Sequence, residues 1–207
     1  MLRAARLGAV IVTAGMCLLL NSGLATAGKK PLVGIPLLFR PTDPKELAAV
    51  KPAELRQVRI GFTTFVEKRE KPDLIGENRE DEDKGKILPV TTSSNVAEFC
   101  GSHMSELFKQ LGVFVVKDDW DVSVAADVVE FQVMERDRYV GTVRLNVDLS
   151  DKNRRVLWSG VALGTSSHWG RSYKAVNYYE TLSDSLVSAT VNLLNDSDFR
   201  RALRSGK

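Results

Sequence analysis

Apolar and polar positions alternate most regularly over Ala126–Thr165, where the pattern predicts three consecutive β-strands. In the middle strand, residues 139–149, an apolar residue or glycine stands at every second position, with mostly polar residues between them. A period of two is typical of a strand with one face on a core and the other in water. The third strand, residues 155–165, is partly apolar on both faces, which leaves its buried face open. Two more strands are expected over residues 58–66 and 113–116.

Two helices are expected to cover the apolar face of this sheet. Apolar residues recur at steps of three and four over residues 95–111 and again over residues 177–194. This spacing places them on one face of each helix. Asn95 followed by Glu98 resembles a capping box at the start of the first helix. The chain is therefore predicted to be an α+β protein, with an antiparallel sheet of four or five strands and both helices packed on one face.

Two further segments lack this periodicity. Residues 28–57 contain five of the seven prolines and predict an extended N-terminal arm. Such an arm either lies along the domain surface or tethers the domain to a partner. Residues 67–86 form a charge run, which is interpreted as a long solvated loop. Its three consecutive carboxylates, residues 81–83, lack the alternating spacing of a calcium loop and do not favour a cation site.

The N-terminus has the pattern of a secretory leader. Arg3 and Arg6 precede a 14-residue apolar run, Leu7–Leu20, which is shorter than the roughly 20 residues that span a bilayer. Ala25-Thr26-Ala27 has the shape of a cleavage site. The expected organisation is a signal peptide over 1–27, the arm over 28–57 and a single domain over 58–207. The predicted location is the periplasm or cell envelope.

Two alternatives concern the leader. Lipidation at Cys17 is disfavoured, because Met16 is too large for the position before a lipidated cysteine. A retained leader is disfavoured by the short apolar run. Membrane contact is expected only in these two cases. Without the leader, 27 basic residues stand against 26 acidic ones, and this near-neutral balance argues against a nucleic-acid partner.

Catalytic motifs are lacking in the sequence. It has no nucleophile elbow, no Walker-type loop and no zinc-protease helix. Cys100 and His103 lie one turn apart and could form a thiolate–imidazole pair. Both fall within the apolar stripe of the first helix, where a cysteine is expected to be buried and inert. We therefore expect no enzyme activity, no metal and no cofactor, and a Cys/His-dependent enzyme is the least favoured alternative.

The candidate functional feature is a surface rather than a catalytic site. A loop over residues 166–175 carries aromatic and basic side chains beside the last helix, of types enriched at binding hot spots. They are His168, Trp169, Arg171, Tyr173 and Lys174. The alternative is that Trp169 folds back over the sheet edge as a core plug.

Several segments together resemble the YajG-like family of bacterial envelope lipoproteins. They are the exported leader, the first strand at 58–66, Asp73-Leu74-Ile75-Gly76, Leu111-Gly112, the strands at 126–133 and 143–149, Leu157-Trp158-Ser159-Gly160, Leu182-Ser183-Asp184-Ser185-Leu186 and Asn195-Asp196-Ser197-Asp198-Phe199. The resemblance covers roughly Val58 to Leu203. It implies a small α/β envelope domain and no established enzymatic role, and this chain departs from the family at the lipidation motif.

These observations favour a non-enzymatic cell-envelope protein that acts as an interaction or accessory module for an unidentified envelope protein. The alternative is a protein that binds a small ligand or a cell-wall glycan through the aromatic loop 166–175.

Overall fold

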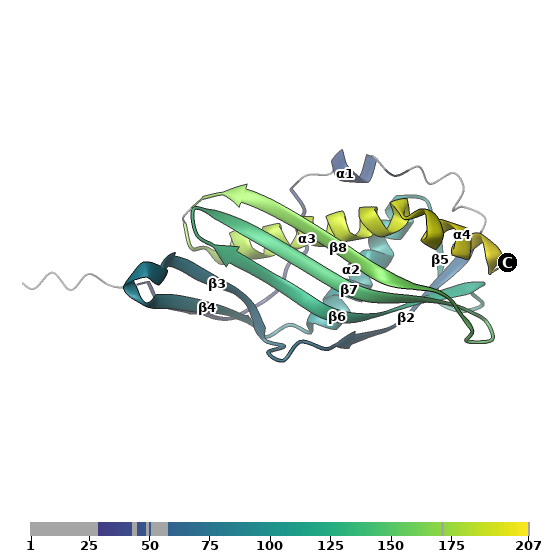
Figure 1. Cartoon of the computed structure of the whole chain (residues 1–207), viewed down its shortest axis with the longest axis horizontal. Coiled ribbons are helices and arrows are strands. Elements are labelled where there is room, and N and C mark those ends of the chain that lie inside the picture. Colours follow the sequence, from purple (N-terminus) through teal and green to yellow (C-terminus); the bar gives the residue numbers. More distant parts are fainter. Residues whose placement is uncertain (1–28, 43–44, 49, 51–57, 171, 207) are drawn as a thin grey trace, which may run out of the picture.

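The computed structural model describes residues 29–42, 45–48, 50, 58–170 and 172–206 (Figure 1). The strands are β1 (Leu32–Ile35), β2 (Arg59–Glu67), β3 (Leu74–Asp81), β4 (Lys86–Thr92), β5 (Phe114–Val116), β6 (Val122–Glu135), β7 (Arg138–Asp151) and β8 (Val156–Trp169). The helices are α1 (Lys45–Ala48), η2 (Glu82–Lys84, a 3-10 turn), α2 (Val96–Gln110), α3 (Ala175–Asn195) and α4 (Ser197–Ser205).

All eight strands belong to one mixed sheet that forks at β6. On one side, β6 pairs antiparallel with β7, and β7 pairs antiparallel with β8. On the other side, the first half of β6 pairs parallel with β2, which pairs parallel with β5. The last residues of β6 pair parallel with β3, which continues to β4 and β1. β6 is therefore the strand that holds the two halves of the sheet together.

The predicted sheet of four or five antiparallel strands is wrong. The structure has eight strands, and four of the strand pairs are parallel. The charge run at 67–86 is not a solvated loop, because β3, η2 and the start of β4 lie within it. The charged side chains of β3 are half-exposed, and they take positions where a typical strand would alternate apolar and polar residues. The sequence of this strand therefore shows no period of two. Its strand conformation depends on pairing with β4 and β6, which the local sequence does not reveal.

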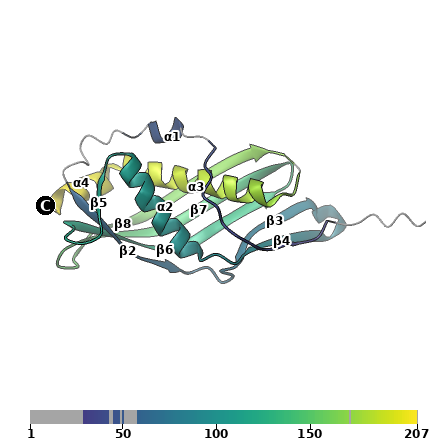
Figure 2. The ribbon, with the colours of Figure 1, turned by 180° about the vertical axis from the view of Figure 1, so that it is seen from behind.

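Both predicted long helices are present as α2 and α3, and they lie on the same side of the sheet (Figure 2). α3 approaches β8 so closely that a Cβ atom on Gly164 would lie 2.0 Å from the carbonyl oxygen of Ser185. The glycine therefore permits the close packing of helix on strand. Within the described residues, no helix combines the length and apolarity needed to cross a membrane.

The packing of α3 also decides which face of β8 is buried. Ala162 is fully buried, whereas Val161 and Leu163 are exposed on the opposite face. Because side chains alternate along a strand, the odd-numbered residues from 161 to 169 point away from the helices. This face of β6, β7 and β8 is the front of Figure 1.

The described part of the N-terminal arm lies along the domain. Its strand β1 adds in parallel to β4, and the chain then crosses the helices (Figure 2). The Phe39 ring stacks on His103 of α2 with centroids 4.2 Å apart. The backbone N–H of Arg40 donates to Ser183 Oγ of α3, and that of Thr42 donates to Asp184 Oδ1. Residues 43–44, 49 and 51–57 of the predicted arm lie outside the described residues, as does the whole leader.

Candidate functional site

Trp169 ends β8 on the face of the sheet that points away from the helices. Residues 166–169 belong to this strand, so the predicted loop is shorter than expected. The indole is 79% exposed, so Trp169 does not fold back as a core plug. The guanidinium carbon of Arg138, the cross-strand neighbour of Trp169, lies 4.3 Å from the ring centroid. This distance is typical of a cation–π pair, which holds the exposed ring in place.

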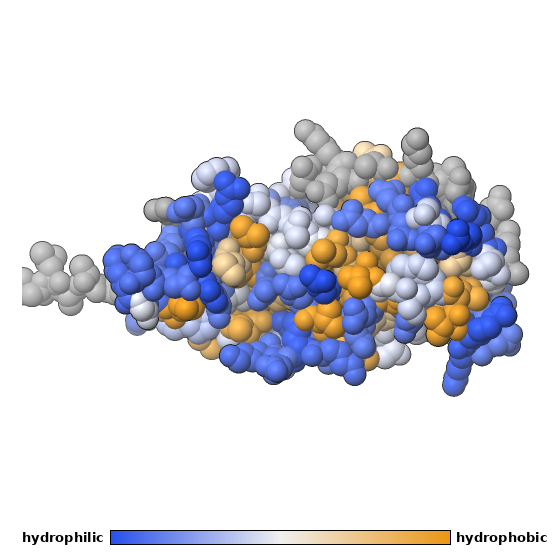
Figure 3. Space-filling model, in the orientation of Figure 1, coloured by the Kyte–Doolittle hydropathy of each residue, from blue (hydrophilic) through white to orange (hydrophobic). Residues whose placement is uncertain are grey.

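Two exposed apolar side chains lie beside this pair. Met134 and Val140 are opposite each other on β6 and β7 and lie on the same outer face. We call these four residues, Met134, Arg138, Val140 and Trp169, the Trp169 patch. Figure 3 views the outer face, where apolar side chains form several clusters separated by hydrophilic ones. The patch is therefore a small mixed surface rather than a continuous apolar one.

The other residues of the predicted interaction surface do not lie with Trp169 on the outer face of the sheet. His168 alternates to the helix side, where its Nε2 lies 2.8 Å from Asp184 Oδ2, although the N–H direction is not aligned for a hydrogen bond. The Tyr173 hydroxyl accepts a hydrogen bond from the backbone N–H of Leu32, at 3.1 Å. Lys174 is exposed at the start of α3. Arg171 lies outside the described residues.

A buried carboxylate behind the patch was not predicted from the sequence. Glu135 is fully buried at the end of β6 and accepts hydrogen bonds from Tyr178 Oη at 2.7 Å and from the Tyr173 N–H at 3.1 Å. Burial, followed by the bond to Glu135, raises the pKa of Tyr178 well above its usual value. These contacts tie the loop before α3 to the sheet. The sequence could have predicted the burial of Glu135, because this residue continues the alternation that places Phe131 and Val133 on the inner face of the strand.

Cys100 and His103 are set in the apolar surroundings expected of them. Burial raises the pKa of the Cys100 thiol well above its usual range and holds it protonated. His103 lies between two phenylalanines, with ring centroids 4.2 Å from Phe39 and 4.5 Å from Phe99. Partial burial lowers the pKa of His103. A protonated thiol is a poor nucleophile, so this pair is not arranged for nucleophilic catalysis.

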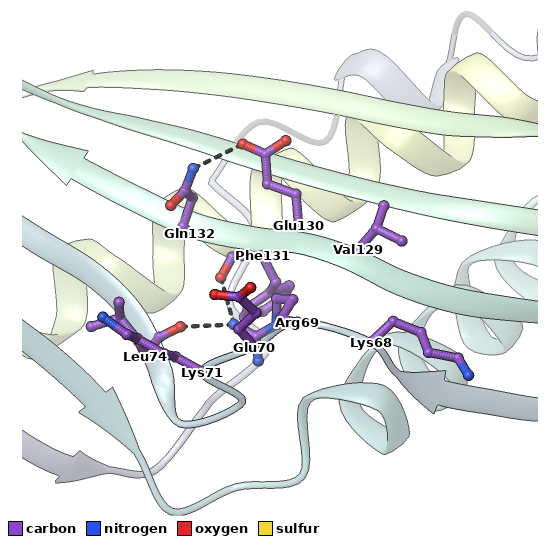
Figure 4. A pocket seen from close by; sticks show the side chains of 9 residues that line it. All are labelled: Lys68, Arg69, Glu70, Lys71, Leu74, Val129, Glu130, Phe131 and Gln132. Atoms are coloured by element: carbon purple, nitrogen blue, oxygen red, sulfur yellow. Dashed lines mark hydrogen bonds between the residues drawn. The ribbon is translucent and has the colours of Figure 1, made fainter.

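A surface depression of about 460 Å³ lies at the fork between β2 and β3 (Figure 4). Arg69 fills its base. The guanidinium donates to both carboxylate oxygens of Glu67 and to the carbonyl oxygens of Leu74, Phe131 and Pro72. These bonds satisfy backbone groups where β6 has no neighbouring strand. The guanidinium of Arg69 is thus fully engaged within the protein, and its hydrogen bonds stabilise the fork of the sheet.

The carboxylates of residues 81–83 are largely engaged in ion pairs. Asp81 pairs with Lys84, and the hydrogen bond from Lys84 holds the pKa of that carboxyl below its usual value. Glu82 pairs with Arg79 and Arg136. Across the described ranges of the chain, no three histidine, cysteine, aspartate or glutamate side chains gather in a way that could hold a metal ion.

Comparison with known proteins gives the fold. No family model matches the sequence, and no curated protein matches it. A crystal structure of protein XCC0632 from Xanthomonas campestris, of the DUF330 family, superposes with a TM-score of 0.56 at 14% identity, covering 84% of this chain and 99% of that one. The chain shares the fold of a DUF330 protein. At this identity the similarity establishes the fold alone.

Two structures that superpose less well are those of a candidate lipoprotein and a lipoprotein. A candidate lipoprotein from Caulobacter crescentus superposes with a TM-score of 0.43 at 13% identity, covering 51% of this chain and 83% of that one. The lipoprotein GNA1162 from Neisseria meningitidis gives a TM-score of 0.29 at 20% identity, covering 56% and 88%. These scores are too low to carry an argument about this chain.

Proposed function

We propose that the protein is a non-enzymatic module of the bacterial cell envelope that binds another envelope protein. The observation that carries the proposal is the Trp169 patch. Tryptophan and arginine are strongly enriched among residues that dominate binding energy, and here one of each is stacked on an exposed sheet face. The cation–π contact with Arg138 fixes the indole before binding, so little side-chain freedom is lost when a partner covers it.

Export is supported by the sequence of the leader, with its basic start, its apolar run and Ala25-Thr26-Ala27. The finer assignment to the YajG-like family rests on the sequence segments quoted above. The alternative of a Cys/His-dependent enzyme is disfavoured by the surroundings of Cys100, whose burial opposes formation of a thiolate.

The proposal is tested by a crosslinked pull-down of the tagged full chain from envelopes of the native host. Trp169→Ala removes the exposed ring, and a stoichiometric partner is expected to be lost or to bind at least tenfold more weakly, the effect of removing a hot spot. Phe114→Ala is the matched control, because Phe114 is an exposed aromatic residue of β5, outside the patch. The proposal fails if no partner is captured, or if both variants retain the partner equally.

The exposed indole also supports the second candidate function, binding of a small ligand or glycan. A ligand that stacks on Trp169 would change its fluorescence, and Trp169→Ala would abolish the change, while Trp120 and Trp158 remain as internal references. A fluorescence change that persists in Trp169→Ala would place the ligand elsewhere.

A further inference from the structure

β8 is an unusually long strand at the edge of the sheet. It has 14 residues and, within the described part of the chain, pairs with β7 alone. The edge strands at the other side are much shorter, with four residues in β1 and three in β5. A long free edge presents a row of backbone donors and acceptors that can pair with another strand.

One hydrogen bond shows which residues present these groups. The Leu163 carbonyl accepts a hydrogen bond from the Asn192 side chain of α3, so it points away from β7. In an antiparallel ladder, the N–H and C=O of one residue point to the same side, and this side alternates along the strand. The backbone groups of Val161, Thr165 and Ser167 therefore also face the free edge. Their side chains lie on the outer face of the sheet, and all three are exposed.

The edge lacks most of the features that usually prevent pairing. Residues 156–167 contain no charged residue and no proline. Proteins commonly protect an edge with lysine, proline or a short strand. Here Val156, Val161 and Leu163 instead expose apolar side chains along the strand. Asn192 covers one carbonyl.

We propose that β8 is a self-association surface, on which β8 of a second copy of this chain pairs antiparallel about a two-fold axis. A second copy fits because the strand is uncharged, so two copies meet without like-charge repulsion. Antiparallel pairing also continues the pattern of β6, β7 and β8. With the axis at Thr165, Val161 of each copy lies opposite Trp169 of the other, a favourable aromatic and β-branched pair.

The size of the contact sets its strength. With the axis at Thr165, residues 161–169 of the two copies overlap. Nine residues extend over about 30 Å, and a sheet edge about 10 Å thick then buries roughly 300 Å² per copy. The total, roughly 600 Å², lies well below the size of a stable interface. The dimer is therefore expected to be weak and to form only at the upper end of a micromolar concentration series.

The first test measures mass by sedimentation equilibrium of the full chain, purified from the envelope, over a micromolar concentration series. The wild type is expected to shift from monomer to dimer as concentration rises. Val161→Lys places a charge on the edge and is expected to weaken the dimer at least tenfold. Asn146→Lys is the matched control, because Asn146 is the cross-strand neighbour of Val161 on β7 and is exposed on the same face, outside the Trp169 patch and one strand from the edge.

The second test locates the contact by oxidative crosslinking. Thr165→Cys places two thiols across the axis and is expected to give a covalent dimer, while Cys100 is buried and does not compete. Thr142→Cys, its neighbour on β7, is expected to remain monomeric. The inference is overturned if the wild type stays monomeric throughout, or if Val161→Lys and Asn146→Lys behave alike. A monomer that captures a different protein would overturn it while leaving the proposed function intact.

Discussion

Arg69 is the side chain on which the fork of the sheet depends. Its guanidinium makes five hydrogen bonds, two to Glu67 and three to backbone carbonyls, and its side chain is only 9% exposed. In Arg69→Ala, the Glu67 carboxylate loses its cation and the carbonyls of Pro72, Leu74 and Phe131 lose a donor. Breaking a fully buried ion pair by removing one partner costs about 3–5 kcal/mol. Glu67 is 22% exposed, so the pair is only partly buried, and the expected loss is about 3 kcal/mol, the lower end of this range.

This loss is measurable by urea unfolding. A slope of about 2 kcal/mol per molar urea converts it into a fall of roughly 1.5 M in the unfolding midpoint. Arg79→Ala is the matched control, because Arg79 pairs with Glu77 and Glu82 near the surface and is 27% exposed. Its loss is expected to stay below about 1 kcal/mol.

A double-mutant cycle separates the ion pair from the backbone contacts. Arg69→Ala combined with Glu67→Ala is expected to lose less than the sum of the single losses, with a coupling of about 1.5 kcal/mol or more. A loss in Arg69→Ala no larger than that in Arg79→Ala would show that the fork holds without the guanidinium of Arg69.

Three further predictions concern packing and protonation. Gly164→Ala is expected to destabilise the domain by about 1–3 kcal/mol in urea unfolding, since its Cβ would collide with the α3 backbone; a neutral effect would contradict the close contact of helix and strand. Tyr178 is held neutral in the folded state, whereas the unfolded chain ionises it above about pH 10, so stability should fall as pH rises beyond that value, and the fall should be shallower in Tyr178→Phe. An unchanged slope would exclude Tyr178 as its source. Phe39→Ala exposes His103 to water and should raise its pKa towards 6.5 in an NMR titration, because burial is what lowers it; an unchanged pKa would mean that the arm does not shield the ring.

The predictions that succeeded depend on local periodicity. The regular alternation at 139–149 became β7, and the two apolar stripes became α2 and α3. Asn95 caps α2 as expected, since its side chain accepts a hydrogen bond from the Glu98 N–H. The strand and both helices repeat their patterns over several strand positions or at least three turns, and the cap is a signal between neighbouring residues, so the local sequence is sufficient to reveal them.

The candidate surface was only partly predictable. The exposure of Trp169 and its contact with Arg138 follow from the register of β7 against β8, which fixes the face on which each side chain lies. The same alternation turns His168 towards Asp184, on the helix side. A sequence-based list could gather these residues by proximity along the chain but could not assign them to opposite faces.

The local sequence is sufficient to predict the long amphipathic elements, the secretory pattern of the leader and the apolar setting of Cys100 and His103. It does not reveal that β3 and β4 form strands, that the sheet forks at β6, or that β8 remains a long free edge, because these features depend on how distant segments pair. The reason is that backbone hydrogen bonds between strands join residues far apart in the chain. A segment such as Leu74–Asp81, with charged residues on a half-exposed face, becomes a strand through its neighbours rather than through its own pattern.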